Sequence, residues 1–262
     1  MIKAIFFDID GTLVPFGHHE VLPSTRDAIR QLREKGVLTF ISTGRHPKWI
    51  DNLGDTKFDG YVTTNGALCL LADEKTVVFC NEIPQEDIQR LVEFTKHSDM
   101  VFVVVPADGE IFATGINDNF RKAAEMLHIP PISIKPIENA LGQPIVQLMC
   151  FADQTDIEAS GLFETTLTDC ESMSWCPLFC DIIKRGTNKS IGMDEMARYN
   201  GFSQDETMAF GDGHNDIGMI RHAKIGVAMG QASDDVKREA DYVTAPCDQD
   251  GIMKALKHFN LL

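Results

Sequence analysis

Residues 4–13 read AIFFDIDGTL, an apolar run that ends in two aspartates and a glycine. The run from Ala4 to Ile9 predicts a buried strand, because short apolar runs bounded by a turn are typical of parallel sheets. If extended backbone persists through Asp10, the side chains of Asp8 and Asp10 point the same way. Two like charges so close are unfavourable unless a cation lies between them or one stays protonated. The stretch therefore predicts either a cation site or a polar turn that closes a strand.

Strand-like and helix-like patterns alternate at both ends of the chain. Ser24, with Asp27 three residues later, predicts the start of a helix that ends at Gly36, and a strand-like run follows at residues 37–43. The same alternation resumes after about residue 184. This order is typical of a parallel sheet covered by helices. We therefore predict an α/β fold, with a Rossmann-like parallel-sheet core, helices on both faces and an inserted α+β cap domain.

The segment between the two alternating parts predicts that inserted domain. Residues 83–183 mix helix-like and strand-like patterns, with a helix expected at residues 118–127 and a strand at residues 145–151. The segment carries 16 Asp and Glu against 5 Lys and Arg. A sheet interrupted once by a self-contained unit indicates a core, an insertion and a return to the core. We predict a catalytic core at residues 1–82 and 184–262 and a cap at residues 83–183.

Composition excludes several classes of partner. The chain has 262 residues, 44% of them hydrophobic, and no apolar run as long as a membrane span. A formal charge of −15 disfavours nucleic acid and anionic membranes, which attract clustered Lys and Arg. The seven scattered cysteines include no C-x-x-C pair, so we expect reduced thiols, a cytoplasmic location and no zinc site.

Three further polar stretches stand where an open parallel sheet binds its ligands, beyond the strand ends. Residues 40–45 read FISTGR, in which Thr43 and Gly44 offer a hydroxyl and N–H groups to a phosphate, unless Thr43 merely caps a helix. Lys189 begins a helical pattern, either as a fixed ammonium or as a solvated surface charge. Residues 210–216 read FGDGHND, which sets two acids and an amide in one turn.

Magnesium is the cation that suits these acids. Mg²⁺ prefers oxygen ligands, and Asp212 follows a predicted strand as Asp8 and Asp10 do. We therefore predict a Mg²⁺ site with Asp212 as a third ligand.

Taken together, these stretches resemble the four motifs of the haloacid dehalogenase superfamily of phosphohydrolases. DIDGT resembles the first motif, STGR the second, Lys189 the third and GDGHND the fourth, in the same chain order. The insertion lies between the second and third motifs, and it is similar to the caps of the Cof-type subfamily. Members of that subfamily act mostly on sugar phosphates and other small metabolites. The resemblance covers almost the whole chain.

The resemblance also implies a role for each matched residue. Asp8 is implied as the nucleophile that forms an aspartyl phosphate, and Asp10 as the general acid and then the base. Mg²⁺ would be held by the side chains of Asp8 and Asp212 and by the backbone carbonyl of Asp10. Asp216 would act through a water molecule or by contacting one of these ligands. The residues implied to grip the phosphoryl oxygens are Ile9, through its amide, Thr43, Gly44, Lys189 and Asn215.

Two side chains and the acidity of the insertion leave alternatives open. Arg45 either contacts the substrate or forms a structural ion pair. Trp175 either stacks on a sugar ring or packs in the core. The acids of residues 83–183 favour a monophosphorylated sugar or polyol, whose hydroxyls donate to carboxylates, or else they serve solubility alone.

We therefore predict a Mg²⁺-dependent phosphomonoesterase that hydrolyses small phosphate esters, most of all hexose phosphates. A phosphomutase shares Asp8 and Asp10 and is one alternative. The other is a non-catalytic module that binds phosphorylated metabolites. Such a module is expected to have lost Asp8, Asp10, Lys189 or Asp212, and all four are present.

Overall fold

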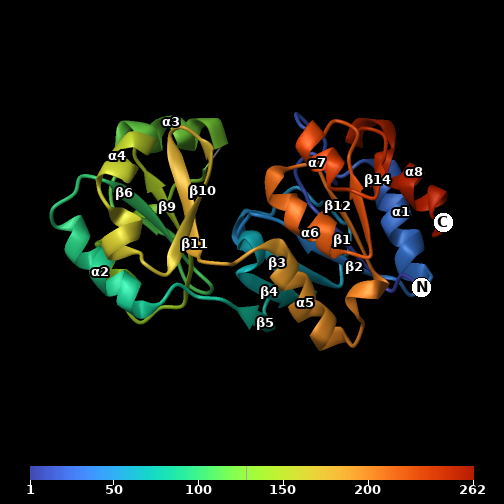
Figure 1. The fold of residues 1–262 in the computed structure, drawn as a ribbon, viewed down its shortest axis with the longest axis horizontal. Coiled ribbons are helices and arrows are strands. Elements are labelled where there is room, and N and C mark those ends of the chain that lie inside the picture. Colours follow the sequence, from blue (N-terminus) through green and yellow to red (C-terminus); the bar gives the residue numbers. More distant parts are fainter. Residues whose placement is uncertain (128) are drawn as a thin grey trace. The chain divides into compact units, whose positions relative to one another are not determined.

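The chain forms two compact units, which are described one at a time. The computed structural model describes residues 1–127 and 129–262, apart from the side chains of residues 127, 174 and 175. Unit 1 comprises Met1–Phe79 and Asn188–Leu262, and unit 2 comprises Cys80–Thr187 (Figure 1). The predicted borders at residues 83 and 183 lie within a few residues of these limits. The assignment of a catalytic role to one unit and of a cap role to the other stays a prediction.

Unit 1 is built on a mainly parallel sheet, which confirms the predicted core. The strand order is β14-β13-β12-β1-β2-β3-β4-β5. Neighbouring strands from β14 to β3 pair in parallel, and β4 runs antiparallel to β3. The strands are β1 (Ala4–Phe7), β2 (Leu38–Ser42), β3 (Gly60–Thr63), β4 (Leu68–Leu71), β5 (Val77–Cys80), β12 (Thr207–Gly211), β13 (Ile225–Ala228) and β14 (Tyr242–Val243).

Helices cover both faces of this sheet, as predicted (Figure 1). On one face, α5 and α6 pack over the rings of Phe6 and Phe40, which stack with centroids 4.9 Å apart. On the other face, α1 and α8 lie together. The helices of unit 1 are α1 (Pro23–Glu34), α5 (Lys189–Asn200), α6 (Ile217–His222), α7 (Asp234–Arg238) and α8 (Gly251–His258).

The start of α1 corrects one prediction. The helix begins at Pro23, its N-cap is Leu22, and no side chain caps it, so Ser24 is already inside the helix. Proline suits the first helical position, because its φ is fixed near the helical value and it has no N–H to satisfy. The backbone constraint of Pro23 therefore sets this helix start in place of a serine cap.

Unit 2 is a separate α+β unit with its own core. Its sheet is mainly antiparallel, with β7 and β8 pairing in parallel, and its order is β10-β11-β9-β6-β7-β8. Ile88 and Leu91 of α2 and Ile157 of α4 pack into one apolar cluster with the sheet. The elements are α2 (Gln85–Thr95), β6 (Val101–Pro106), β7 (Phe112–Ala113), α3 (Asp118–Leu127), β8 (Ser133–Ile134), β9 (Ile145–Phe151), α4 (Gln154–Ala159), β10 (Cys170–Cys176) and β11 (Phe179–Lys184).

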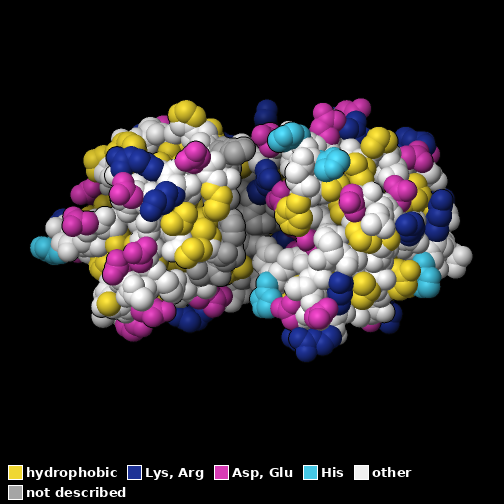
Figure 2. Space-filling view, turned by 90° about the horizontal axis from the view of Figure 1, so that it is seen from above, with side chains coloured by type: hydrophobic (Ala, Val, Ile, Leu, Met, Phe, Trp, Pro, Cys, Tyr) yellow, Lys and Arg dark blue, Asp and Glu magenta, His cyan; other side chains and the backbone are white. Residues whose placement is uncertain are grey.

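The distribution of Asp and Glu side chains on the surface of unit 2 bears on whether they bind substrate or serve solubility. On the face that Figure 2 shows, acidic side chains are scattered among basic, hydrophobic and polar ones and do not gather in one patch. That distribution is typical of a solvent-facing surface. Among the helices of the described residues, none combines the length and the apolar character that crossing a membrane requires.

Strand register brings the polar stretches of unit 1 to one edge of its sheet. Phe7 at the end of β1 pairs with Ile41 of β2 on one side and with Phe210 of β12 on the other. The residues that follow these three positions therefore leave the sheet at the same edge. They include Asp8, Thr43 and Asp212.

Candidate active site

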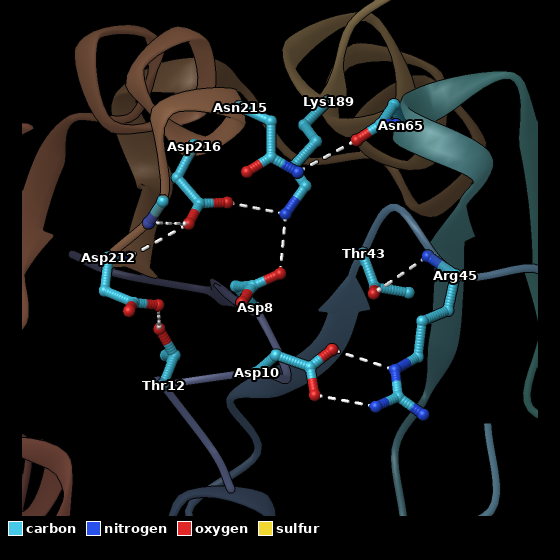
Figure 3. A network of polar contacts seen from close by, with 11 residues as sticks. Asp8, Asp10, Thr12, Thr43, Arg45, Asn65, Lys189, Asp212, Asn215 and Asp216 are labelled. Atoms are coloured by element: carbon cyan, nitrogen blue, oxygen red, sulfur yellow. Dashed lines mark hydrogen bonds and ion pairs between the residues drawn. The ribbon is translucent and has the colours of Figure 1, made fainter. Parts of the chain in front are cut away.

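A buried lysine joins two aspartates from distant parts of the chain. Lys189 is the first residue of α5, and the side chain of its N-cap, Asn188, accepts a hydrogen bond from the Ile191 N–H. The Lys189 Nζ lies 2.6 Å from Asp8 Oδ1 and 2.5 Å from Asp216 Oδ1 (Figure 3). The Lys189 side chain is 0% exposed. It is therefore a fixed internal cation, and the alternative of a solvated surface charge is wrong.

A third carboxylate, that of Asp212, lies close to the two that contact Lys189. One carboxylate oxygen from each of Asp8, Asp212 and Asp216 lies within 4.8 Å of the others. Burial raises the pKa of Asp8 well above its ordinary value, the charge of Asp216 adds to the rise, and Lys189 opposes it. Burial and the charge of Asp216 also raise the pKa of Asp212 to about 6. Burial lowers the pKa of Lys189, but the two carboxylates outweigh burial and the net direction is upward.

The same cluster passes a test for a divalent cation. Its three carboxylates carry more negative charge than the single ammonium of Lys189 neutralises. Burial first, and the charge of Asp216 second, raise the pKa of Asp8 and of Asp212, so a bound cation would offset an unfavourable burial of charge. Its donor atoms are all oxygens, as Mg²⁺ prefers. The residues of the cluster therefore fit a divalent cation.

Asp216 has a supporting place in this arrangement. Its Oδ2 accepts hydrogen bonds from the N–H groups of Asp212, at 2.9 Å, and Gly213, at 2.8 Å, while its Oδ1 contacts Lys189. Both oxygens are therefore occupied by groups of the protein. Asp216 shapes the turn that presents Asp212 and holds the ammonium in place.

Asp212 is held from two further sides. Thr12 Oγ1 donates to Asp212 Oδ1 at 3.1 Å, and Gln231 Nε2 lies 3.4 Å from Asp212 Oδ2. Gly11 has φ +81°, and a Cβ at this position would stand 2.2 Å from Asp212 Oδ2. The glycine of the DIDGT stretch therefore makes room for the Asp212 carboxylate, in addition to allowing the turn.

Asp10 has a different partner from Asp8. Arg45 donates from Nε to Asp10 Oδ2 at 2.8 Å and from Nη2 to Asp10 Oδ1 at 2.7 Å (Figure 3). The prediction that both carboxylates point to one spot assumed extended backbone through Asp10. The strand ends at Phe7 and a turn follows, in which the Ile9 carbonyl accepts from the Leu13 N–H at 2.9 Å. The turn directs the two carboxylates to separate basic partners.

The predicted phosphate-binding residues of the second and fourth motifs meet at a residue that the sequence patterns did not single out. Asn215 Nδ2 donates to Asn65 Oδ1 at 3.0 Å, and a Cβ on Gly44 would stand 3.1 Å from the same oxygen. Thr43 Oγ1 accepts from the Arg45 N–H at 3.1 Å. The next helical turn, Pro47–Trp49, has His46 as its N-cap, so the alternative that Thr43 caps a helix is wrong.

Two residues of the site, Asn65 and Gln231, were not predicted from the sequence, and their places in the fold show which signal could have selected them. Asn65 follows β3, at the edge where β1, β2 and β12 also end, so the same strand-end rule selects it once β3 is included. Gln231 carries no charge, but it stands three residues after β13, which pairs in parallel with β12, so the same rule selects its loop. The Trp175 side chain lies outside the described residues, so its stacking on a sugar ring stays a prediction.

Known proteins are similar to this chain in both sequence and fold. A family model described as haloacid dehalogenase-like hydrolase matches residues 5–256. The Bacillus subtilis (strain 168) protein YkrA, a phosphatase by name, is 30% identical over 262 residues, which cover 99% of this chain and 98% of YkrA.

Two solved structures extend the likeness over the whole chain. The sugar phosphatase BT4131, of subclass IIB of the superfamily, is 40% identical with a TM-score of 0.85, over 99% of this chain and 100% of that one. The phosphatase BT1666 from Bacteroides thetaiotaomicron is 33% identical with a TM-score of 0.89, over 100% and 96% of the two chains. The chain therefore belongs to the haloacid dehalogenase-like hydrolases, as a capped phosphatase of their Cof-type subclass.

Proposed function

We propose that this phosphatase hydrolyses monophosphorylated sugars, hexose phosphates above all, with Mg²⁺ and through an aspartyl phosphate on Asp8. One observation carries the chemistry: the buried Lys189 ammonium lies 2.6 Å from Asp8 Oδ1 in a site that also holds Asp212 and Asp216. A carboxylate nucleophile can approach an anionic phosphate only where fixed positive charge offsets the repulsion. Lys189 supplies part of that charge.

The first half of the reaction transfers the phosphoryl group to the protein. A carboxylate oxygen of Asp8 attacks phosphorus, the bond from phosphorus to the ester oxygen breaks, and Asp10 donates a proton to the departing oxygen. Lys189 and the amide of Asn215 offset charge on the phosphoryl oxygens, together with the Thr43 hydroxyl and the backbone N–H groups of Ile9 and Gly44. The products of this half are the free alcohol and phosphorylated Asp8.

The second half returns Asp8 to its starting state. A water molecule attacks the phosphorus of the aspartyl phosphate and gives a proton to Asp10, the bond from phosphorus to the Asp8 oxygen breaks, and inorganic phosphate leaves. The side chains of Asp8 and Asp212 and the backbone carbonyl of Asp10 would hold Mg²⁺. Asp216 would contact these ligands or a bound water molecule. When bound, the ion supplies positive charge that lowers the repulsion between the site and the phosphate.

The support for a sugar-phosphate substrate comes from the relatives of this chain. Neither the surface charge nor any contact of unit 2 adds to it. The sugar phosphatase BT4131 is 40% identical to this chain. The B. subtilis proteins YitU and YcsE, 26% and 29% identical, are 5-amino-6-(5-phospho-D-ribitylamino)uracil phosphatases by name. The higher identity favours sugar phosphates. We assign catalysis to unit 1, which contains every residue of the site, the choice of leaving group to unit 2, and the whole protein to the cytoplasm.

A phosphate-release assay on a panel of esters tests the proposal. The panel contains hexose phosphates, polyol phosphates, nucleotides and 5-amino-6-(5-phospho-D-ribitylamino)uracil, each with Mg²⁺ and with excess chelator. Wild type should release phosphate fastest from a hexose phosphate and only with Mg²⁺, whereas Asp8→Asn should release none. A preference for another ester would reject the sugar substrate, and release in the presence of chelator would reject the metal requirement.

A phosphomutase is the alternative that shares Asp8 and Asp10. The enzyme would then retain the phosphoryl group for transfer to a second hydroxyl and would need a bisphosphorylated activator. Stoichiometric phosphate release without any activator would reject a mutase. Isomerised sugar phosphate without free phosphate would establish one.

A further inference from the structure

A strained turn follows β3 in unit 1. Thr64, Asn65 and Gly66 all have positive φ, at 47°, 53° and 98°. Positive φ is rare for a β-branched residue such as threonine and costs conformational free energy, so it persists only where the surroundings impose it. Strain of this kind is concentrated at functional sites, which makes the turn a candidate for a role in catalysis.

Contacts with two proposed parts of the site hold this turn in place. The Thr64 N–H donates to the Arg45 carbonyl at 3.0 Å, and the Asn65 N–H donates to the Thr43 carbonyl at 3.0 Å. The turn is therefore hydrogen-bonded to the loop after β2, which contains the predicted phosphate-binding residues Thr43 and Gly44.

The turn also abuts the start of α5. A Cβ on Gly66 would stand 2.0 Å from the Asn188 carbonyl oxygen, so the two backbones are in direct contact. Asn188 is the N-cap of the helix whose first residue is Lys189. The same turn therefore touches the loop after β2 and the backbone that carries the lysine.

The side chain of Asn65 extends this support to a third part. It is 4% exposed, whereas Asn215, whose Nδ2 donates to Asn65 Oδ1 at 3.0 Å, is exposed (Figure 3). An exposed amide alone rotates freely among several orientations. Because one N–H of the Asn215 amide is committed to a buried acceptor, the plane of the amide and the direction of its second N–H are fixed.

We propose that Asn65 is a positioning residue for phosphate binding, which acts by orienting the Asn215 amide. The inference rests on the proposed function, in which Asn215 contacts the phosphoryl oxygens. Glycine would adopt the backbone conformation of residue 65 at lower cost. The presence of asparagine, which tolerates the left-handed region better than most residues, indicates that its amide is used.

The variant Asn65→Gly tests the role of the amide without disturbing the backbone. It keeps a residue suited to φ 53° and removes the acceptor for Asn215. The KM for the substrate and the inhibition constant of inorganic phosphate should each rise about 2- to 10-fold, the range for one lost hydrogen bond, with kcat changed less than about 2-fold. The matched control is Asn260→Gly, at an exposed residue with φ 55°, which should leave all three constants unchanged.

A double-mutant cycle with Asn215→Ala separates positioning from two other roles. If Asn65 acts through Asn215, Asn65→Gly should have no further effect on phosphate binding in the Asn215→Ala background. An equal loss in both backgrounds would overturn the proposal, because Asn65 would then contact phosphate itself or only stabilise the turn. Unchanged constants for Asn65→Gly alone would overturn it as well.

Calorimetric titration with inorganic phosphate keeps this test independent of turnover. The coupling between Asn65 and Asn215 is measured from phosphate affinity even if no ester of the panel is hydrolysed. An inactive wild type with coupled phosphate binding would contradict the proposed function alone. An active wild type without coupling would contradict the role of Asn65 alone.

Discussion

Asp10 and Arg45 form a bidentate ion pair, in which Arg45 Nε lies 2.8 Å from Asp10 Oδ2 and Nη2 lies 2.7 Å from Oδ1. The Nη1 of the same guanidinium donates to the Trp49 carbonyl at 3.0 Å. A planar guanidinium with two donors fixes the plane of a carboxylate, as a single ammonium does not. In this arrangement both oxygens accept from Arg45, so the pair orients Asp10 as the proton acceptor that the second half of the proposed reaction needs.

Arg45→Lys should keep the charge and lose the fixed orientation. We expect kcat to fall about 10-fold, a part of the 10²- to 10⁴-fold that general acid–base catalysis contributes, with a smaller change in KM. Steady-state kinetics on the best ester of the panel measures both constants. The control is Arg30→Lys on α1, whose ion pairs with Asp27 and Glu34 are exposed. An unchanged kcat for Arg45→Lys would show that the pair has no catalytic role.

Lys189→Met should strongly destabilise the fold. The change leaves the buried carboxylates of Asp8 and Asp216 without their shared cation, and losing one partner of a buried ion pair costs about 3 to 5 kcal/mol. Urea unfolding in the absence of Mg²⁺ measures the loss. Lys224→Met removes an exposed lysine 3.9 Å from Asp205 and should cost less than about 0.5 kcal/mol. Equal losses for the two variants would contradict the internal role of Lys189.

Asp8→Asn should have the opposite effect on stability. Burial and the charge of Asp216 raise the pKa of Asp8, so the ionised form is unfavourable in the folded protein, and a neutral amide relieves that cost. Turnover should fall at least about 10⁴-fold, because the nucleophile is lost. The unfolding temperature at neutral pH, without Mg²⁺, should stay the same or rise. A marked fall would mean that the contact with Lys189 outweighs the repulsion.

The stability of the metal-free protein should depend on pH through Asp212. Its pKa is about 6 in the folded protein against an ordinary value of 3.8, so the folded state holds the proton more tightly. The resulting stabilisation of the folded state is complete when the pH is below the ordinary pKa of 3.8, and it is lost as the pH rises through about 6. Mg²⁺ requires the ionised carboxylate, so it should raise the unfolding temperature more at about pH 7.5 than at about pH 5.

Thermal unfolding with and without Mg²⁺ measures this dependence at both pH values. Asp212→Asn is the control, since it removes the titrating group and should abolish most of the Mg²⁺ effect. A Mg²⁺ effect of equal size at both pH values in wild type would contradict the assignment of Asp212 as a ligand.

Sequence was sufficient for the elements whose pattern is local. The alternation of apolar runs and amphipathic segments predicted the parallel sheet of unit 1, and the bounds of α3 and β9 agree with the prediction residue for residue. The start of α1 was mispredicted because two local signals compete there, a serine cap and a proline. The fixed φ of Pro23 prevailed.

The site was only partly predictable because its partners are distant in sequence. Motif spacing selected Asp8, Lys189 and Asp212, but not which side chains they contact. The pairing of Asp10 with Arg45 depends on the turn after β1, and the pairing of Asn215 with Asn65 depends on the order of strands. Such contacts follow from topology, which a pattern along the chain does not encode.

Lys189 stands two residues beyond Thr187, where the chain leaves unit 2 and re-enters unit 1. Because the helix cap at Asn188 and the backbone contact with Gly66 fix this junction, an insertion or deletion there would shift the ammonium relative to the nucleophile. The other junction, at Phe79 and Cys80, lies farther along the chain from every residue assigned to the site. Exchange of the intervening domain between relatives should therefore tolerate length changes just after β5 at the first splice point, whereas a change of one residue at the second should impair catalysis.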